Sequence, residues 1–142
     1  MSKGPSRSDY PHFLRIETRW ADNDVYGHVN NAAYHAFFDT AVNRFLLDTG
    51  LLHLTESPSF GVVVETGCRY FKPLAFPDSI DAGVKVAKLG DSSVRYELGL
   101  FRAGEDDPAA TGHFVHVYVD RQTRRPVPIP DEVRAALRTL LR

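Results

Sequence analysis

The feature that most constrains the fold is one apolar stripe at helical spacing in the first half of the chain. Apolar residues recur at steps of three and four from Tyr34 to about Thr49, which predicts a helix with one broad buried face. Asn30 is placed to cap the start of this helix, and Gly50 is placed to stop it. Such a helix requires a second apolar surface, which the rest of the chain must supply.

Runs of alternating polar and apolar residues, which are typical of strands, supply that surface. One run leads from Phe13 to Trp20, and four more follow the helix at residues 60–71, 79–89, 94–101 and 110–119. Polar turn residues separate the last three runs, which predicts antiparallel hairpins. We therefore expect an α+β fold in which a long central helix is wrapped by a five- to six-stranded antiparallel sheet.

The two ends of the chain are less regular. Residues 1–10 are small, polar and interrupted by proline, so we expect a flexible lead-in without assigned structure. Residues 131–141 predict a short closing helix. A chain of 142 residues with 43% hydrophobic residues is long enough for one core, so residues 11–142 are expected to form a single domain.

Charge and composition exclude several classes of partner. The 17 basic and 18 acidic residues give a net charge of −1, which provides no overall attraction for nucleic acid or for an anionic membrane. The chain has no apolar run of 18 residues, its opening lacks the apolar core of a secretory signal, and Cys68 is its only cysteine. We therefore expect a cytoplasmic protein with no nucleic-acid and no membrane partner.

The polar turn that runs directly into the helix is the strongest functional signal. From Asp22 to Asn31 it holds two aspartates, a histidine and neighbouring asparagines. The first turn of a helix presents unpaired backbone N–H groups and the positive end of the helix dipole, which suit a polarised carbonyl or an oxyanion. A carboxylate beside such donors indicates acyl chemistry.

Metal-binding and other catalytic motifs do not fit the sequence. Asp22 and Asp24 suggest the start of a calcium loop, but Ala33 stands where a bidentate glutamate is required. The six histidines give no convincing zinc spacing, and there is no Gly-x-Ser-x-Gly elbow. Cys68 lies in a valine-rich run and is expected to be a small core residue. We expect no metal and no cofactor.

The segment Asp24-Val25-Tyr26-Gly27-His28-Val29-Asn30-Asn31-Ala32-Ala33-Tyr34 resembles the Asp-x-x-x-His-Val-Asn-Asn-x-x-Tyr run of bacterial acyl-CoA thioesterases and plant acyl-ACP thioesterases. The order and length of the elements, over Phe13 to Leu140, resemble the hotdog-fold thioesterases of the 4-hydroxybenzoyl-CoA thioesterase-like group. The resemblance implies a hotdog fold and hydrolysis of an acyl-CoA, or an acyl carrier protein thioester, to a free acid. It also implies a homodimer or homotetramer with the active site between subunits.

The resemblance also assigns roles to residues in the turn. It implies that Asp24 is the catalytic carboxylate, acting as general base on water or as direct nucleophile. It implies that the amides at the start of the Asn31 helix polarise the thioester carbonyl, with His28 as an assistant. The plant enzymes use an asparagine two residues beyond their aspartate, where this chain has Tyr26, so proposals based on that asparagine do not transfer.

Each of these residues also has a structural interpretation. Asp24 can be a turn or capping residue, and Asn30 and Asn31 can be cap and first-turn residues. Asp22 can repel Asp24, be solvated or pair with Arg19. The candidate substrate-binding residues, which the turn, the helix and the next strand carry, are Tyr26, Gly27, Asn30, Tyr34, Glu65 and Arg69.

The basic residues give no single phosphate site. Arginine and lysine suit the phosphates of coenzyme A, although any one of them can equally be a solvated surface residue. The candidates are Arg69, Lys72, Lys88, Arg95, Arg124 and Arg125. Two other functions remain as alternatives: a non-catalytic hotdog protein that binds acyl thioesters, and a hotdog hydratase or dehydratase.

Overall fold

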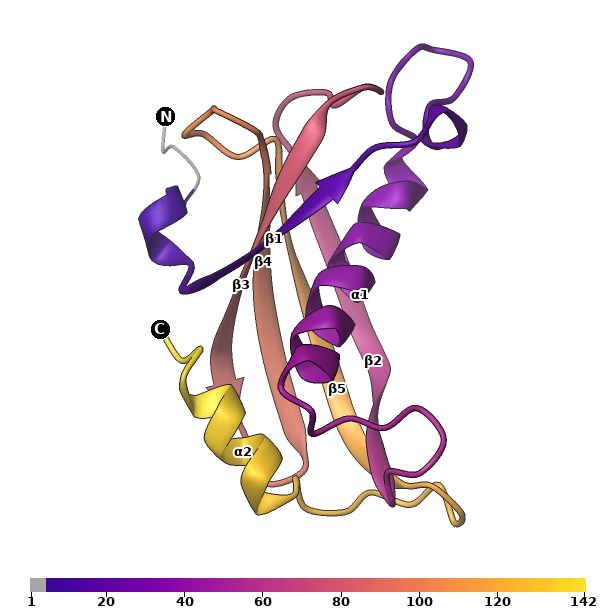
Figure 1. Cartoon of the computed structure of the whole chain (residues 1–142), viewed down its shortest axis with the longest axis vertical. Coiled ribbons are helices and arrows are strands. Elements are labelled where there is room, and N and C mark those ends of the chain that lie inside the picture. Colours follow the sequence, from indigo (N-terminus) through magenta and orange to yellow (C-terminus); the bar gives the residue numbers. More distant parts are fainter. Residues whose placement is uncertain (1–4) are drawn as a thin grey trace.

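The computed structural model describes residues 5–142 and folds them into one sheet and two α-helices, with two short 3₁₀ helices near the start (Figure 1). The 3₁₀ helices cover Arg7–Asp9 and Trp20–Asp22. In chain order the other elements are β1 (His12–Glu17), α1 (Asn31–Asp48), β2 (Ser59–Tyr70), β3 (Ser79–Leu89), β4 (Ser93–Arg102), β5 (Ala110–Asp120) and α2 (Asp131–Arg138).

The five strands form one antiparallel sheet in the order β1-β3-β4-β5-β2, so β1 and β2 are its two edges. The helix α1 lies along one face of this sheet, as Figure 1 shows. The predicted α+β arrangement, a long helix wrapped by an antiparallel sheet, is therefore confirmed with five strands. This is the hotdog fold. None of the helices in the described part of the chain is long and apolar enough to span a membrane.

The start and the end of α1 follow from local sequence. The Asn30 side chain accepts a hydrogen bond from the amide of Ala32 at 2.9 Å, which satisfies one of the unpaired amides of the first turn. Gly50, beyond the end of the helix, has a φ of +76°, a conformation that favours glycine. The predicted cap and stop are both confirmed.

The core lies between α1 and the sheet. The buried residues of α1 are those of the predicted stripe apart from Phe45, which is only partly buried: Tyr34, Phe37, Phe38, Ala41, Val42 and Leu46. Phe38 is fully buried against Gly112 of β5, where a Cβ atom would lie 2.3 Å from the phenyl ring. A glycine at this position therefore lets the helix approach the sheet closely, and burial of the ring contributes about 1.5–3 kcal/mol.

A β-bulge in β2 changes which residues share a face. Simple alternation predicted that Val62 and Thr66 lie on one face of the strand. The register instead shifts between Val63 and Glu65, so that Val62 pairs with Val117 and Thr66 pairs with Phe114. Phe114 belongs to the core and Val117 lies on the opposite face, so the prediction was wrong beyond the bulge.

The N-terminal segment also differs from expectation. No structure was assigned to residues 1–10, but Arg7–Asp9 form a 3₁₀ helix and Tyr10 is buried. The ring of Tyr10 covers Gly83 and Gly99, which pair with each other on the face of the sheet away from α1. This anchor is a tertiary contact that local polarity could not reveal. The expectation for residues 1–4 lies outside the described residues.

Candidate active site

The Asp24 turn is closed by its own backbone. The amide of Asp24 donates to the carbonyl of His28 at 3.0 Å, and the amide of Gly27 donates to the carbonyl of Asp24 at 3.1 Å. Gly27 has a φ of +84°, which an L-residue rarely adopts, so the tight turn requires glycine there. The turn thereby holds Asp24 immediately before the helix.

The carboxylate of Asp24 is half-buried and is held by two neutral donors. One oxygen accepts from the amide of Tyr26 at 2.9 Å, and the other accepts from the side-chain amide of Asn30 at 3.3 Å. No cation pairs with Asp24 among the described residues. A carboxylate that is oriented but not neutralised by a cation remains available as a base or a nucleophile.

Asn30 connects this carboxylate to the start of α1. Its side-chain nitrogen donates to Asp24 while its side-chain oxygen accepts from the amide of Ala32. Its carbonyl accepts from the amide of Ala33 at 2.9 Å. The amides of Ala32 and Ala33 are therefore used by the cap, whereas the amide of Asn31 has no acceptor within residues 5–142. The amide at the first position of α1 is therefore free to donate to a ligand.

The alternatives for Asp22 are decided by its contacts. Asp22 is buried, accepts from the backbone amide of Arg19 at 2.7 Å and pairs with the Arg19 guanidinium at 2.9 Å. Its carbonyl accepts from the amide of Asn30 at 2.8 Å. Asp22 is therefore a buried anchor paired with Arg19.

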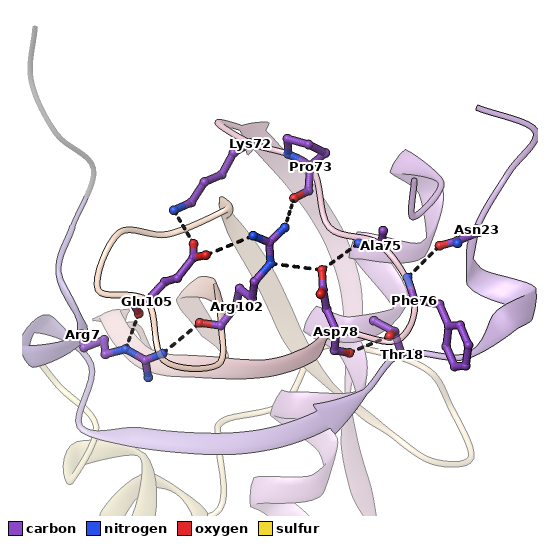
Figure 2. Close-up of polar contacts among 10 residues, drawn as sticks. All are labelled: Arg7, Thr18, Asn23, Lys72, Pro73, Ala75, Phe76, Asp78, Arg102 and Glu105. Carbon is purple, nitrogen blue, oxygen red and sulfur yellow. Dashed lines mark hydrogen bonds and ion pairs between the residues drawn. The ribbon is translucent and has the colours of Figure 1, made fainter. Parts of the chain in front are cut away.

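The segment 72–78 supports the turn from the other side. The amide of Val29 donates to the carbonyl of Leu74 at 2.7 Å, and the side chain of Asn23 accepts from the amide of Phe76 at 3.0 Å. Figure 2 shows the second of these contacts beside the ion pairs that hold the segment. The turn and the segment therefore form one hydrogen-bonded unit.

Arg102 is the centre of these ion pairs (Figure 2). Its guanidinium contacts Asp78 at 3.1 Å and Glu105 at 3.0 Å, and it also donates to the carbonyl of Pro73 at 3.1 Å. Glu105 accepts in addition from Lys72 at 2.6 Å. Together Lys72 and Arg102 hold the pKa of the Glu105 carboxyl below its usual value.

A cavity of about 300 Å³ lies between the start of α1 and the end of β2. The Tyr70 hydroxyl donates to the Asn31 carbonyl at 3.0 Å, and its ring packs edge-to-face on Tyr34 at 4.9 Å. Desolvation raises the pKa of Tyr70 to about 12, so this hydroxyl stays protonated and can donate. The cavity is lined by His28, Val29, Asn31, Tyr34, Tyr70, Phe71, Lys72 and Pro73.

Only some of the predicted site residues lie near the Asp24 turn and the cavity beside Asn31. Asp24, Asn30, Asn31, His28 and Tyr34 lie in the turn, at the helix start or around the cavity. The side chain of Tyr26 is directed to solvent, because the residue is 84% exposed and bonds Asp24 only through its amide.

Glu65 and Arg69 lie on the face of the sheet away from α1. Glu65 contacts His113 at 2.8 Å and Arg95 at 3.6 Å, and Arg69 pairs along the ladder with Thr111. Neither side chain lines the cavity beside Asn31. Within one copy of the chain they are separated from the Asp24 turn.

The candidate phosphate donors are spread over several surfaces. Lys72 alone lines the cavity beside Asn31, while Arg69 and Arg95 line a groove of about 470 Å³ on the other face of the sheet. The remaining three are exposed elsewhere: Lys88, Arg124 and Arg125. Lys72 is therefore the candidate nearest the proposed chemistry.

Sequence reasoning missed Tyr70 and Phe71 as residues of the cavity. Tyr70 is the last residue of β2, and Phe71 follows it. Tyr70 lies 39 residues beyond Asn31, and no local pattern marks the contact between them. Cys68 is half-buried, and desolvation raises the pKa of its thiol, which disfavours the reactive thiolate. In the described part of the chain no group of three His, Cys, Asp or Glu residues could hold a metal ion.

Comparison with known proteins gives the family. The model of the thioesterase-like superfamily matches residues 18–137. The crystal structure of the PA5185 protein from Pseudomonas aeruginosa is 53% identical, with a TM-score of 0.94 and 96% of each chain covered. A thioesterase from Thermus thermophilus, solved with coenzyme A and zinc, is 32% identical, with a TM-score of 0.76 and coverage of 93% of this chain and 95% of that one.

A curated sequence relative adds a second type of thioester. The chloroplastic acyl-acyl carrier protein thioesterase ATL3 of Arabidopsis thaliana is 22% identical over 141 residues, covering 98% of this chain and 73% of its own. The family match spans most of the chain, including the Asp24 turn, α1 and the whole sheet except β1. The chain belongs to the thioesterase-like superfamily.

Proposed function

We propose that the protein hydrolyses an acyl-CoA thioester to a free acid and coenzyme A, with Asp24 as the catalytic carboxylate. The observation that carries this proposal is the hydrogen-bonded unit of Asp24, Asn30 and the start of α1. Within residues 5–142 it sets a carboxylate that pairs with no cation beside a helix start whose Asn31 amide is free to donate. The superfamily match supports thioester chemistry for this arrangement.

The reaction follows from these groups. The carbonyl oxygen of the thioester accepts from the Asn31 amide, and the positive end of the α1 dipole stabilises the charge that develops on that oxygen. Asp24 removes a proton from water as the water oxygen bonds to the carbonyl carbon. The carbon–sulfur bond then breaks, and the thiolate takes up the proton. Asp24 can alternatively attack the carbonyl carbon directly, so that the carbon–sulfur bond breaks, the thiolate leaves and a mixed anhydride forms. Water then hydrolyses the anhydride to the free acid and the Asp24 carboxylate, and the thiolate takes up the released proton.

The neighbouring residues have supporting roles in this proposal. His28 is the assistant on the cavity wall, and Gly27 permits the turn. Tyr34 lines the part of the cavity where the acyl group begins. Lys72, on the same wall, is the candidate donor to a phosphate of coenzyme A. An acyl carrier protein thioester is the alternative substrate, by analogy with the Arabidopsis relative.

A second copy of the chain is part of the proposal. β2 is a 12-residue edge strand, and it carries exposed apolar residues such as Val63, Val64 and Tyr70. A long edge strand with exposed apolar side chains favours pairing with another strand. We propose that two copies pair through β2, which places residues of one copy beside the Asp24 turn of the other. Glu65 would then be a candidate to reach the partner's site.

The experiment is thiol release from a panel of short, long and aromatic acyl-CoA thioesters, with product acid identified by mass spectrometry. Turnover of any member supports the proposal and ranks the acyl groups. Enoyl-CoA is included, because hydration without thiol release would identify a hydratase instead. If all thioesters bind but none is cleaved, the proposal is wrong and the non-catalytic binding protein is the better interpretation.

A further inference from the structure

The segment 72–78 links β2 to β3 and forms neither helix nor strand, yet it holds both sides of the Asp24 turn. Its Leu74 carbonyl accepts from the amide of Val29 at 2.7 Å, and one of its backbone amides donates to the Asn23 side chain at 3.0 Å. Asn23 and Val29 also form an isolated β-bridge with each other. A shift of the segment is therefore passed on to the residues on either side of Asp24.

A single guanidinium holds both ends of this segment (Figure 2). Arg102 donates through Nη2 to the Pro73 carbonyl at 3.1 Å and through Nε to the Asp78 carboxylate at 3.1 Å. The same oxygen of Asp78 accepts from the Ala75 amide at 2.9 Å. The two contacts of Arg102 thus fix the start and the end of the segment, with the Leu74 carbonyl between them.

The sheet gives Arg102 a rigid base. Arg102 is the last residue of β4 and pairs along the ladder with Ile80 of β3. Its carbonyl accepts from the Arg7 guanidinium at 3.2 Å, and its Nη1 donates to the Glu105 carboxylate at 3.0 Å. A side chain that starts from a strand and is held by its neighbours fixes a contact more precisely than one that starts from a loop.

The contacts require the geometry of arginine and not only its charge. Each of the three guanidinium nitrogens of Arg102 donates to a different partner: Asp78, Glu105 and Pro73. Lysine has one nitrogen at the end of a flexible chain, so it can keep the charge but not three fixed directions. A partly exposed ion pair by itself contributes little to stability, so the value of this arrangement lies in the position that it fixes.

We propose that Arg102 is a positioning residue for the reaction: it fixes the segment 72–78, and the segment fixes the turn that carries Asp24. This inference rests on the proposed thioesterase function and adds a residue that does not touch the substrate. Arg102 does not line the cavity beside Asn31. A displacement of about 1 Å in a reacting group can cost about 10²-fold in rate, so its loss acts on the chemical step and not on binding.

The test compares Arg102→Gln and Arg102→Lys with wild type on the best thioester from the panel, with each rate referred to folded protein. We expect Arg102→Gln to lower kcat by about 10- to 100-fold while KM changes by less than about threefold. Arg102→Lys keeps a charge beside Asp78 and should recover part of kcat. A kcat that both folded variants retain, or a change confined to KM, would overturn the proposal.

Arg134→Gln is the matched control. Arg134 of α2 also donates to two loop carbonyls, those of Gly90 at 2.9 Å and Asp91 at 2.8 Å. These residues lie between β3 and β4, at the end of β3 away from the segment 72–78. Arg134→Gln should therefore keep the wild-type kcat. A loss equal to that of Arg102→Gln would overturn the proposal, because the effect would not depend on which loop is released.

Hydrogen exchange separates this inference from the proposed function, because it needs no turnover. Exchange of the Val29 amide is followed by NMR and compared with that of the Tyr118 amide, which donates to the Ser92 carbonyl at the other end of the sheet. Relative to Tyr118, Val29 should exchange about tenfold faster in Arg102→Gln and at the wild-type rate in Arg134→Gln.

The two readouts can fail independently. If wild type cleaves no thioester but Val29 shows the expected exchange, the proposed function is wrong and the hold of Arg102 on the turn is supported. If wild type cleaves thioesters but Arg102→Gln leaves the exchange of Val29 unchanged, the proposed function stands and the role of Arg102 is overturned.

Discussion

Polar side chains near the two ends of α1 differ in burial and in hydrogen bonding. At the start of the helix, Asp24 and Asn30 are held by hydrogen bonds and stay partly exposed, next to residues of the same turn that line a cavity. Near the far end, His116 of β5 is buried against Tyr96 and Phe114, and neither of its ring nitrogens has a hydrogen-bond partner among residues 5–142. Backbone turns and caps can therefore orient a reacting group at the surface, whereas packing alone fixes a buried one. The first arrangement suits chemistry, and the second keeps a polar ring inside the apolar core.

The largest expected effect on stability concerns the protonation of His116. Its pKa is about 4 in the folded chain against a usual value of 6.5, so between these values the unfolded chain binds more protons. The stabilisation is present above pH 6.5 and is lost as the pH falls toward 4, by on the order of 3 kcal/mol. Asp39, the nearby carboxylate, opposes part of this shift.

Urea unfolding of wild type and His116→Phe at pH 7 and pH 4 measures this effect. The wild-type free energy of unfolding should fall more than that of the variant by about 3 kcal/mol. Parallel losses in the two proteins would mean that the histidine is not desolvated, and the contrast between the two ends of the helix would disappear.

A smaller effect on stability is expected from replacing one glycine near each end of α1. Gly61→Ala should cost about 1–3 kcal/mol, because the new Cβ meets the His116 ring at 2.7 Å. Gly27→Ala meets no atom within 4 Å, and should cost about 1–2 kcal/mol through its φ of +84° alone. His116→Ala should relieve the first cost and leave the second unchanged. A double-mutant cycle by thermal unfolding checks this, and absence of coupling between positions 61 and 116 would contradict the geometry.

The smallest effect on stability is expected at Asn30, where two substitutions distinguish its role as a helix cap from its contact with Asp24. Asn30→Ala should lower the free energy of unfolding by about 1 kcal/mol, because the helix loses its cap. Asn30→Asp should keep the cap but place a second carboxylate beside Asp24, which removes a donor and raises the pKa of the pair. We expect near wild-type stability with reduced thiol release near pH 7. Equal activity in Asn30→Asp and wild type would show that the hydrogen bond from Asn30 to Asp24 does not contribute to thiol release.

Most of the fold could be predicted because its signals are local. The stripe of α1, the cap at Asn30 and the turn glycine at Gly50 depend on residues within one or two helical turns. The predicted span of β3, residues 79–89, agrees with the observed strand. Alternation failed in β2 at the bulge between Val63 and Glu65, because a bulge inserts one residue without a compositional mark.

The candidate site could be predicted only where its residues are contiguous in sequence. The Asp24 turn is a continuous motif, so its residues could be named from sequence, and their catalytic roles stay predictions. Tyr70, Lys72 and His116 reach their places through strand pairing, which the sequence does not specify residue by residue. The burial of Tyr10 was missed for the same reason, since its partners Gly83 and Gly99 lie far along the chain.

The most direct measurement is the kcat/KM of Asp24→Asn against that of Asp22→Asn with the best thioester from the panel. The two aspartates are two residues apart, but in the part of the chain that the structure describes Asp24 pairs with no cation, whereas Asp22 is buried against Arg19. We expect Asp24→Asn to lose about 10²- to 10⁴-fold in activity with less than about 1 kcal/mol of stability, because asparagine can still accept from the Tyr26 amide. Asp22→Asn should keep its activity within a few-fold and lose stability. Full activity of folded Asp24→Asn, or equal losses in both variants, would contradict a catalytic role for Asp24.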